Sequence, residues 1–337
     1  EVQQLAGGFE MPGAAKLQFA AGIETGGPVD VEATPWPKRP EHALSVGGVN
    51  VAFLSTSRGC IGECAYCSIR AFGRDMGGPR FRMRPIESVA DEIAALHDAR
   101  DVRLFFVQDD LFILTDERKT IERMEALTCA LHARGVRDAF FWIKGRPESI
   151  TEAVLGAARG LGAIHVFLGI ESGSDDRLLY LGRTHRVEDN VRALELCRRH
   201  GVRPSFNFMM FDPDCTLDDV AKTIDLAAAN PDLPWNLCRT EVYSGTRLFD
   251  RLREEGRLQG DYRCYGYRMR DDRCEVMFRI LRVCLDERAF AFESLLNKLI
   301  SLSFARQVHE ALFPGPGTER LSSLVDALVV EAHEDTV

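Results

Sequence analysis

"VAFLSTSRGCIGECAYCSI", residues 51–69, joins a short apolar run to a loop that carries three cysteines. The cysteines are Cys60, Cys64 and Cys67, and their spacing is C-x3-C-x2-C. The run "VAFLST" (51–56) has the length and composition of a buried β-strand. The three thiols therefore follow directly after the first strand that the sequence predicts.

The alternation of a short apolar run with an amphipathic segment is repeated along the chain. The sequence predicts strands at 51–56, 103–108, 139–144, 164–170, 203–210 and 236–242, and helices at 88–99, 117–134, 150–160, 187–200, 216–229 and 246–255. Six consecutive strand-helix units favour a parallel sheet with helices outside it. Because a closed barrel of this type has eight units, we expect an α/β fold with an open, partial (β/α)6 TIM-like barrel.

This rhythm divides the chain into three parts. Residues 1–48 are rich in Gly and Pro and are predicted to be an extended lead-in, or the remnant of a longer N-terminal region. Residues 49–255 form the predicted barrel, and residues 256–337 form a helical C-terminal region without strand rhythm. In such barrels the loops after the strands converge on one mouth, and the three cysteines lie in one of those loops.

Composition limits the classes of partner. Of the 337 residues 45% are hydrophobic and 28% are charged, which is typical of a globular protein. The net charge of -9 argues against a nucleic-acid partner. No apolar run approaches a membrane span and the start does not resemble a signal peptide, so we expect a cytoplasmic protein without a membrane partner. Ten cysteines are too sparse for a secreted disulfide scaffold.

Two kinds of inorganic site could use the cysteine array. A structural zinc site needs four ligands, and the nearby histidines offer no fourth ligand at a suitable spacing. An iron-sulfur cluster is held by thiolates at short, unequal spacings. Three cysteines would leave one iron of a cubane without a protein ligand, so that iron could bind a substrate or a cofactor.

The segment "SRGCIGECAYCSI" resembles the signature of the radical S-adenosylmethionine (radical SAM) superfamily. The resemblance implies that the three cysteines bind a 4Fe-4S cluster whose open iron chelates S-adenosylmethionine, with an aromatic residue, here Tyr66, before the third cysteine. "VQDDLF" (107–112) resembles the stretch that receives the amino group of the cofactor. It implies contacts from Gln108, Asp109 and Asp110, and a capping role for the two aspartates in the next turn is the alternative.

Later motifs extend the resemblance over residues 50–255. "GIESGS" (169–174) resembles the motif near the ribose and methionine of the cofactor, which implies contacts from Glu171 and Ser172. Arg183 in "LGRTH" is predicted to reach the cofactor carboxylate, with a solvated turn as the alternative. A carboxylate such as Glu171 at the end of an apolar strand needs a partner, which favours a functional role.

The barrel motifs are most similar to those of cobalamin-associated and antibiotic- or sugar-tailoring radical enzymes. We expect cleavage of S-adenosylmethionine to a 5'-deoxyadenosyl radical and hydrogen abstraction from a small polar substrate, such as an aminosugar or nucleoside sugar, in natural-product biosynthesis. Dehydration, decarboxylation or epimerisation would follow, which makes a lyase or isomerase the first expectation. An acidic mouth with Asp110, Glu241 and Asp212 would suit an amine, and Asp110 and Glu241 are the candidate catalytic groups.

The alternative is a cobalamin-dependent methyltransferase. A cobalamin domain would have to be missing from this chain, because only 59 residues precede Cys60 and they contain no D-x-H-x-x-G motif. In either case the cluster needs an external electron donor of the flavodoxin or ferredoxin type. A third hypothesis, a non-catalytic protein with a structural cluster, predicts a cluster without cleavage of S-adenosylmethionine.

Other chemistry-bearing residues are predicted to be structural. Cys264, Cys274 and Cys284 lack a close C-x2-C pair, so buried or partly buried thiols are favoured over a second cluster. His165 lies in a predicted strand, and a hydrogen-bonded core histidine is favoured over a catalytic one. Lys144 and Arg146 follow the third strand, where anion binding and ion pairing are equally expected.

Overall fold

The fold is built on one curved sheet. The computed structural model describes residues 30–31, 34–40, 44–76 and 78–336. In this part of the chain the sheet has seven strands in the order β1-β2-β5-β6-β7-β8-β9. Their bounds are β1 Leu44–Val46, β2 Val49–Leu54, β5 Val102–Val107, β6 Phe140–Gly145, β7 Ala163–Glu171, β8 Arg203–Phe211 and β9 Trp235–Arg239. The last six are parallel, and β1 pairs with β2 antiparallel.

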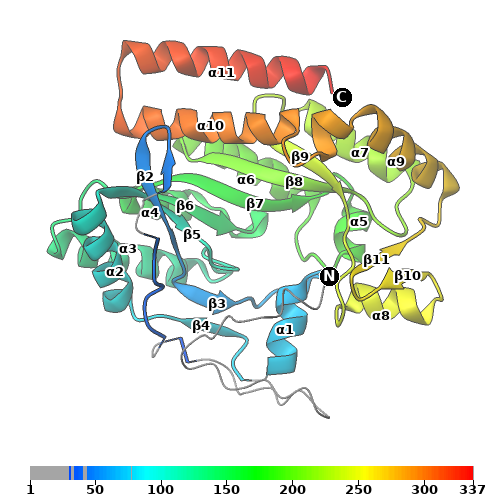
Figure 1. Cartoon of the computed structure of the whole chain (residues 1–337), viewed down its shortest axis with the longest axis horizontal. Coiled ribbons are helices and arrows are strands. Elements are labelled where there is room, and N and C mark those ends of the chain that lie inside the picture. Colours follow the sequence, from blue (N-terminus) through cyan, green and yellow to red (C-terminus); the bar gives the residue numbers. More distant parts are fainter. Residues whose placement is uncertain (1–29, 32–33, 41–43, 77, 337) are drawn as a thin grey trace, which may run out of the picture.

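Helices follow the parallel strands; all but the last cover the outer face of the sheet, and the last, α8, lies beside the later hairpin (Figure 1). They are α2 Ile86–Arg100, α3 Glu117–Ala133, α4 Glu152–Leu161, α6 Val187–His200, α7 Leu217–Ala228 and α8 Arg247–Glu254. Local sequence sets their ends. Thr216 caps α7 in a capping box with Asp219, and Gly201 ends α6 in the left-handed region at φ +65°. The predicted six-unit partial barrel is therefore confirmed.

Side chains alternate between the two faces of each strand. On the outer face Phe105 and Phe141 are fully buried beneath the helices and stack with ring centroids 5.6 Å apart. The alternate residues of each strand, including Phe106 and Trp142, lie on the inner face. Burial of the outer face fixes the register, because a shift by one residue would exchange the two sets.

Two long C-terminal helices close the inner face at the amino-terminal ends of the strands. They are α10 (Leu295–Leu312) and α11 (Pro316–Glu334), which lie side by side in Figure 1. Phe304 of α10 packs 5.1 Å from the ring of Phe106. His165 hydrogen-bonds Gln307 of α10 and Ser205, each at 2.7 Å. The prediction of a hydrogen-bonded core histidine is confirmed, and the carboxyl ends of the strands remain the open side.

The structure corrects the prediction that residues 256–337 contain no strands. β10 (Leu258–Asp261) and β11 (Cys264–Tyr267) form an antiparallel hairpin before α9 (Asp272–Cys284). The hairpin has a two-residue connection at 262–263, and Tyr267 packs into the main core. Its strands are too short for a clear periodicity, which explains why sequence reasoning missed them.

The remaining short elements lie around the cysteine loop and the mouth. They are β3 Ser57–Gly59, α1 Ser68–Met76, β4 Phe81–Met83 and α5 Asp175–Tyr180, with helical turns at 147–149 and 286–290. β3 pairs with β4 and so anchors the start of the cysteine loop. None of the described helices is both long and apolar enough to cross a membrane.

Candidate active site

The cysteine loop lies at the carboxyl end of the sheet and is held by neighbouring loops. The backbone N–H of Ala65 donates to the carbonyl of Leu181 at 2.8 Å, and the N–H of Leu248 donates to the carbonyl of Ala65 at 2.9 Å. Gly182 packs so closely that a Cβ there would lie 2.7 Å from the carbonyl oxygen of Glu63. The loops after β7 and β9 therefore fix the cysteine loop in place.

The three thiols share one environment. Cys60, Cys64 and Cys67 are free and partly exposed. Burial raises the pKa of Cys60 and of Cys67, and the neighbouring thiols raise each pKa further. The sulfurs are thus close enough to interact electrostatically, and a positively charged group between them would favour the thiolates.

The spacing of these thiols bears on which inorganic group they suit. Among the described residues no three His, Cys, Asp or Glu side chains converge closely enough to hold a single metal ion. A zinc ion needs sulfur ligands about 2.3 Å from one centre. The described side chains around the cysteine loop therefore do not form a single-ion zinc site in this structure.

Three of the predicted cofactor residues come together beside Cys64. The Tyr66 hydroxyl donates to Glu171 Oε1 at 2.8 Å. Arg183 Nη1 lies 3.3 Å from Cys64 Sγ and 3.7 Å from Glu171 Oε1, and Arg183 Nη2 donates to the carbonyl of Gly169 at 2.8 Å. Burial, followed by the Glu171 carboxylate, raises the pKa of Tyr66, which keeps the hydroxyl protonated as a donor.

The backbone at the end of β7 determines the positions of the Glu171 and Arg183 side chains. Glu171 has φ +63°, an uncommon conformation for a residue other than glycine. A Cβ at Gly169 would lie 2.6 Å from Arg183 Nη2 and 3.1 Å from Glu171 Oε1. The glycine therefore gives the guanidinium its space. Sequence reasoning missed this role, although "LGIE" shows a glycine inside an otherwise apolar strand, a pattern that indicates close approach.

A second guanidinium lies on the other side of the cysteine loop. Arg146 Nε donates to Glu148 at 2.6 Å and Nη2 donates to Thr184 Oγ1 at 3.0 Å. A Cβ at Gly62 would meet Arg146 Nη1 at 2.6 Å and Cys60 Sγ at 3.4 Å. Of the two roles left open for Arg146, ion pairing is thus observed, next to the cysteine loop.

Asp109 has a structural position, in contrast to its predicted contact with the cofactor. Its side chain is fully buried and accepts from the N–H and hydroxyl of Thr56, at 2.6 and 2.5 Å, and from those of Ser57, at 3.0 and 2.6 Å. Arg123 pairs with it at 3.1 Å. These contacts tie the carboxyl end of β5 to the start of the cysteine loop, and the predicted contact of Asp109 with the cofactor stays a prediction.

The neighbours of Asp109 differ from it. Asp110 accepts from the N–H of Gly59 at 2.9 Å, so it also steadies the loop. Gln108 is partly exposed on the inner face beyond Phe106, where it can meet a ligand.

Ser172 also lies outside the mouth. It is buried, its Oγ is 3.2 Å from Thr223 Oγ1, and it accepts from the N–H of Ser174 at 3.1 Å. These contacts connect the loop after β7 to α7. Ser172 therefore supports this loop, and its predicted contact with the cofactor stays a prediction.

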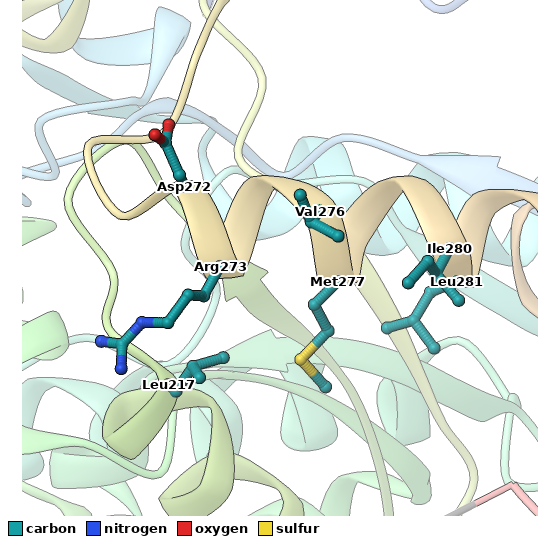
Figure 2. Close-up of a pocket in the computed structure, with 7 residues that line it drawn as sticks. All are labelled: Leu217, Asp272, Arg273, Val276, Met277, Ile280 and Leu281. Atoms are coloured by element: carbon teal, nitrogen blue, oxygen red, sulfur yellow. The ribbon is translucent and has the colours of Figure 1, made fainter.

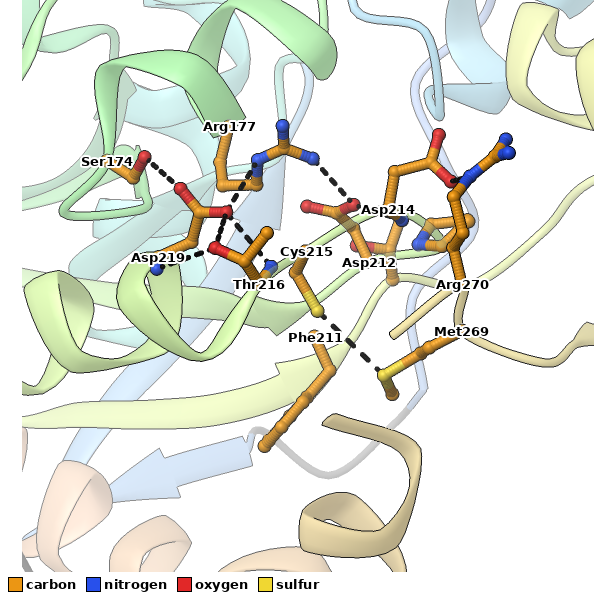
Figure 3. Close-up of polar contacts among 12 residues, drawn as sticks. Ser174, Arg177, Phe211, Asp212, Asp214, Cys215, Thr216, Asp219, Met269 and Arg270 are labelled. Atoms are coloured by element: carbon orange, nitrogen blue, oxygen red, sulfur yellow. Dashed lines mark hydrogen bonds and ion pairs between the residues drawn. The ribbon is translucent and has the colours of Figure 1, made fainter. Parts of the chain in front are cut away.

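The predicted acidic mouth does not form as one receptor. Asp212 is fully buried and pairs with Arg177 at 3.3 Å, as Figure 3 shows. Burial, opposed in part by Arg177, raises the pKa of Asp212 to about 6. Asp110 is used by the loop, and Glu241 is exposed and accepts from the hydroxyl of Tyr243. Of the three carboxylates, Glu241 alone remains exposed.

Of the later cysteines, Cys264 begins β11, whereas Cys274 and Cys284 lie near the start and at the end of α9. Cys274 is buried, whereas Cys264 and Cys284 are exposed. The expectation of buried or partly buried thiols holds for Cys274 and is wrong for the other two. Cys215, in the cluster of Figure 3, is buried with its sulfur 3.8 Å from Met269 Sδ.

A separate hollow of about 680 Å³ lies between α7 and α9 (Figure 2). Its lining is mostly apolar and consists of Leu217, Asp272, Arg273, Val276, Met277, Ile280 and Leu281. None of the predicted site residues lines it, so the chemistry is to be sought at the cysteine loop.

Comparison with known proteins agrees with this location. The Radical SAM superfamily profile matches residues 54–227, just over half of the chain. An uncharacterized methyltransferase of Pyrococcus horikoshii is 26% identical over 63% of this chain, and an anaerobic magnesium-protoporphyrin IX monomethyl ester cyclase of Rubrivivax gelatinosus is 30% identical over 54%. The matched regions cover 44% and 32% of those relatives, so the chain spans less than half of their length.

Solved structures share the fold. The cobalamin-dependent S-adenosylmethionine radical enzyme OxsB, with aqua-cobalamin and S-adenosylmethionine bound, superposes with a TM-score of 0.61 at 17% identity, covering 84% of this chain and 46% of that one. The radical S-adenosylmethionine methyltransferase TsrM of Kitasatospora setae gives a TM-score of 0.60 at 16% identity, covering 84% and 62%. At these identities the likeness shows the architecture alone.

Proposed function

Since this chain belongs to the radical SAM superfamily, we propose that Cys60, Cys64 and Cys67 hold its 4Fe-4S cluster and leave one iron open to S-adenosylmethionine. The observation that carries this assignment is the grouping of three interacting thiols at the carboxyl end of the sheet, with Arg183 3.3 Å from Cys64 Sγ. The guanidinium offsets part of the negative charge that thiolates bring to the site.

The residues beside the cluster loop have separate tasks in binding the cofactor. Arg183 is positioned to meet the carboxylate of S-adenosylmethionine, since its guanidinium lies 3.3 Å from Cys64 Sγ. Glu171, held by Tyr66, and Gln108 supply acceptors for amino or hydroxyl groups. When bound, the cluster and the cofactor supply one-electron reduction and the 5'-deoxyadenosyl radical. The protein orients both and excludes water.

Methyl transfer is the reaction that the relatives support better. The Pyrococcus relative is named an uncharacterized methyltransferase, and the Rubrivivax relative is named a cyclase. A methyltransferase of the cobalamin-dependent type would combine this barrel with a cobalamin-binding part. Hydrogen abstraction followed by elimination or epimerisation is the second candidate, because exposed Glu241 can accept a proton from a substrate at the mouth.

The experiment is anaerobic reconstitution with iron and sulfide, followed by dithionite and S-adenosylmethionine. We expect about four irons per chain and release of 5'-deoxyadenosine. Cys64→Ala should lose the cluster and the cleavage, whereas Cys129→Ala, at an exposed cysteine on α3, should keep both. A cluster without cleavage, in the presence and absence of added cobalamin, would favour a structural cluster and contradict the proposal.

The two reactions separate in the same assay. If the labelled methyl group of S-adenosylmethionine appears in the product when cobalamin is added, the result supports methyl transfer. Deuterium moving from substrate to 5'-deoxyadenosine without methylation supports the second candidate, and Glu241→Gln should then slow turnover. A flavodoxin- or ferredoxin-like protein should replace dithionite as the electron donor in either case.

A further inference from the structure

We propose that the substrate of this half-barrel has a flat aromatic or conjugated ring system and an anionic group, the ring lying on the inner face of the sheet and the anion at Lys144. This inference rests on the proposed function, which places the chemistry at the carboxyl end of the same inner face. It replaces the small polar amine expected from the sequence with a different substrate class.

The inner face carries a row of rings on neighbouring strands, which we call the aromatic wall: Phe53, Phe106, Trp142 and Phe167. In the sheet register Phe53 is paired with Phe106, and Phe106 with Trp142. Successive ring centroids are 5.3, 5.9 and 5.9 Å apart. Three strand spacings of about 4.8 Å give a wall roughly 14 Å wide, enough for two or more fused rings.

This wall is only partly covered. Phe53 is 46% exposed although its neighbours Ala52 and Leu54 are 5% and 2% exposed. Phe106, Trp142 and Phe167 are partly exposed, and so are the inner-face residues of β8 nearer the mouth. Phe304 of α10 covers the amino-terminal side of the row, so the uncovered side faces the cysteine loop. Exposed rings within parallel strands leave apolar area that a ligand can bury.

Lys144 supplies the charge at this wall. It lies two residues beyond Trp142 toward the mouth, is paired in register with Phe167, and holds its Nζ 5.5 Å from the Trp142 ring centroid. Among the described residues the Lys144 ammonium has no hydrogen bond or ion pair, and its contact is with the Trp142 ring, although the carboxylates of Asp110 and Asp109 are near enough to act on it through space. A half-buried ammonium without a direct partner favours an anionic ligand.

The two aspartates beside Lys144 already have partners within the protein. Asp109 is fully used by Thr56, Ser57 and Arg123, and Asp110 accepts from the N–H of Gly59. An ammonium group placed over the rings would therefore meet Lys144, whereas the carboxylates of Glu171 and Glu241 lie farther toward the mouth. Aromatic pairs add attraction beyond the area they bury, which favours a conjugated ring over a saturated one.

The test is calorimetric binding to the reconstituted protein with S-adenosylmethionine present, using naphthalene-2-carboxylate, cyclohexanecarboxylate, naphthalene-2-methanol and glucosamine as probes. We expect naphthalene-2-carboxylate to bind at least about 10-fold more tightly than the saturated acid or glucosamine. Trp142→Leu and Phe53→Leu should each weaken it roughly 5- to 10-fold. Lys144→Met should weaken the carboxylate by about 10-fold and leave the alcohol unchanged. Trp36→Leu, a change at a tryptophan outside the sheet, is the matched control and should have no effect.

Equal binding of the saturated and aromatic acids, tightest binding of glucosamine, or wild-type affinity in the Phe53 and Trp142 variants would each overturn the inference. Phe53→Leu changes an exposed ring, so it keeps the test valid if Trp142→Leu does not fold. Release of 5'-deoxyadenosine is measured on the same samples. Cleavage without ring selectivity overturns the substrate class alone, whereas ring selectivity without cleavage overturns the proposed function.

Discussion

Replacing Asp109 by alanine tests whether this carboxylate supports the cysteine loop rather than the cofactor. The change removes four hydrogen bonds, from Thr56 and Ser57, and the ion pair with Arg123. Asp109 is fully buried and Arg123 is 9% exposed, so the arginine would remain buried without its partner. Breaking such a pair from one side costs about 3–5 kcal/mol.

The expected loss is therefore at least about 4 kcal/mol, because two backbone N–H groups also lose their acceptor. Since natural domains have about 5–15 kcal/mol of stability, Asp109→Ala should be folded only marginally. Asp109→Asn keeps the shape and one acceptor oxygen and should lose less. Glu122→Ala, at an exposed pair on the same helix as Arg123, should change stability by no more than about 0.5 kcal/mol.

The assay is equilibrium urea unfolding of the reduced protein without iron, followed by circular dichroism, with iron uptake measured separately. We expect the order wild type, Asn variant, Ala variant in both stability and iron content, because Thr56 and Ser57 begin the loop that carries Cys60. An alanine variant within about 1 kcal/mol of wild type that still takes up a full cluster would refute this reasoning.

Three further predictions concern the site and the core. Gly169→Ala should raise the Kd for S-adenosylmethionine roughly 10-fold in equilibrium dialysis, because its Cβ would lie 2.6 Å from Arg183 Nη2; unchanged affinity would show that the guanidinium does not meet the cofactor. Arg183→Lys should retain more affinity than Arg183→Gln in the same assay, and the opposite order would contradict a charge contact. Burial raises the pKa of Asp212 to about 6, so Asp212 binds a proton more readily in the folded chain than in the unfolded chain. Its contribution to the free energy of unfolding therefore falls as the pH rises through about 4 to 6. Asp212→Asn should raise the free energy of unfolding by roughly 1–3 kcal/mol relative to wild type at pH 7 but change it little at pH 4. Burial lowers the pKa of His165 to about 4, so its contribution to the free energy of unfolding rises with pH. Urea unfolding of the variant and of the wild type is therefore compared at each pH, where His165 contributes equally to both. A difference in the free energy of unfolding that does not change with pH would contradict the Asp212 assignment.

The strand-helix rhythm was predictable because each parallel strand is buried on its outer face and each helix presents one apolar side to it. The predicted helix at 187–200 coincides with α6, and the strand predicted at 164–170 lies within β7 (Ala163–Glu171). The hairpin of β10 and β11 was missed because strands of four residues hold too little pattern to separate them from a loop.

The site was harder to predict residue by residue. Tyr66, Glu171 and Arg183 meet beside Cys64, as their motifs indicated, although they are far apart in sequence. The motif around Asp109 indicated a polar group near the cofactor, but the sequence does not show that Arg123 reaches back from α3 to pair with it. Such long-range pairing depends on the packed fold and leaves no local signal.

The exposure of the aromatic rings on the inner face was also not predictable from the sequence. Phe53, Phe106 and Trp142 lie in strands with adjacent aromatic and aliphatic residues, so the sequence alone does not separate rings packed under helices from rings that face the mouth. Register and exposure make the distinction.

Mössbauer spectroscopy of the protein reconstituted with ⁵⁷Fe, before and after addition of S-adenosylmethionine, tests the central claim most directly. If three cysteines anchor a cubane and its fourth iron takes up the cofactor, one quarter of the iron signal should change its isomer shift on addition while the rest stays constant. Four irons that do not respond, or a site that takes up one zinc ion in place of iron, would contradict the account.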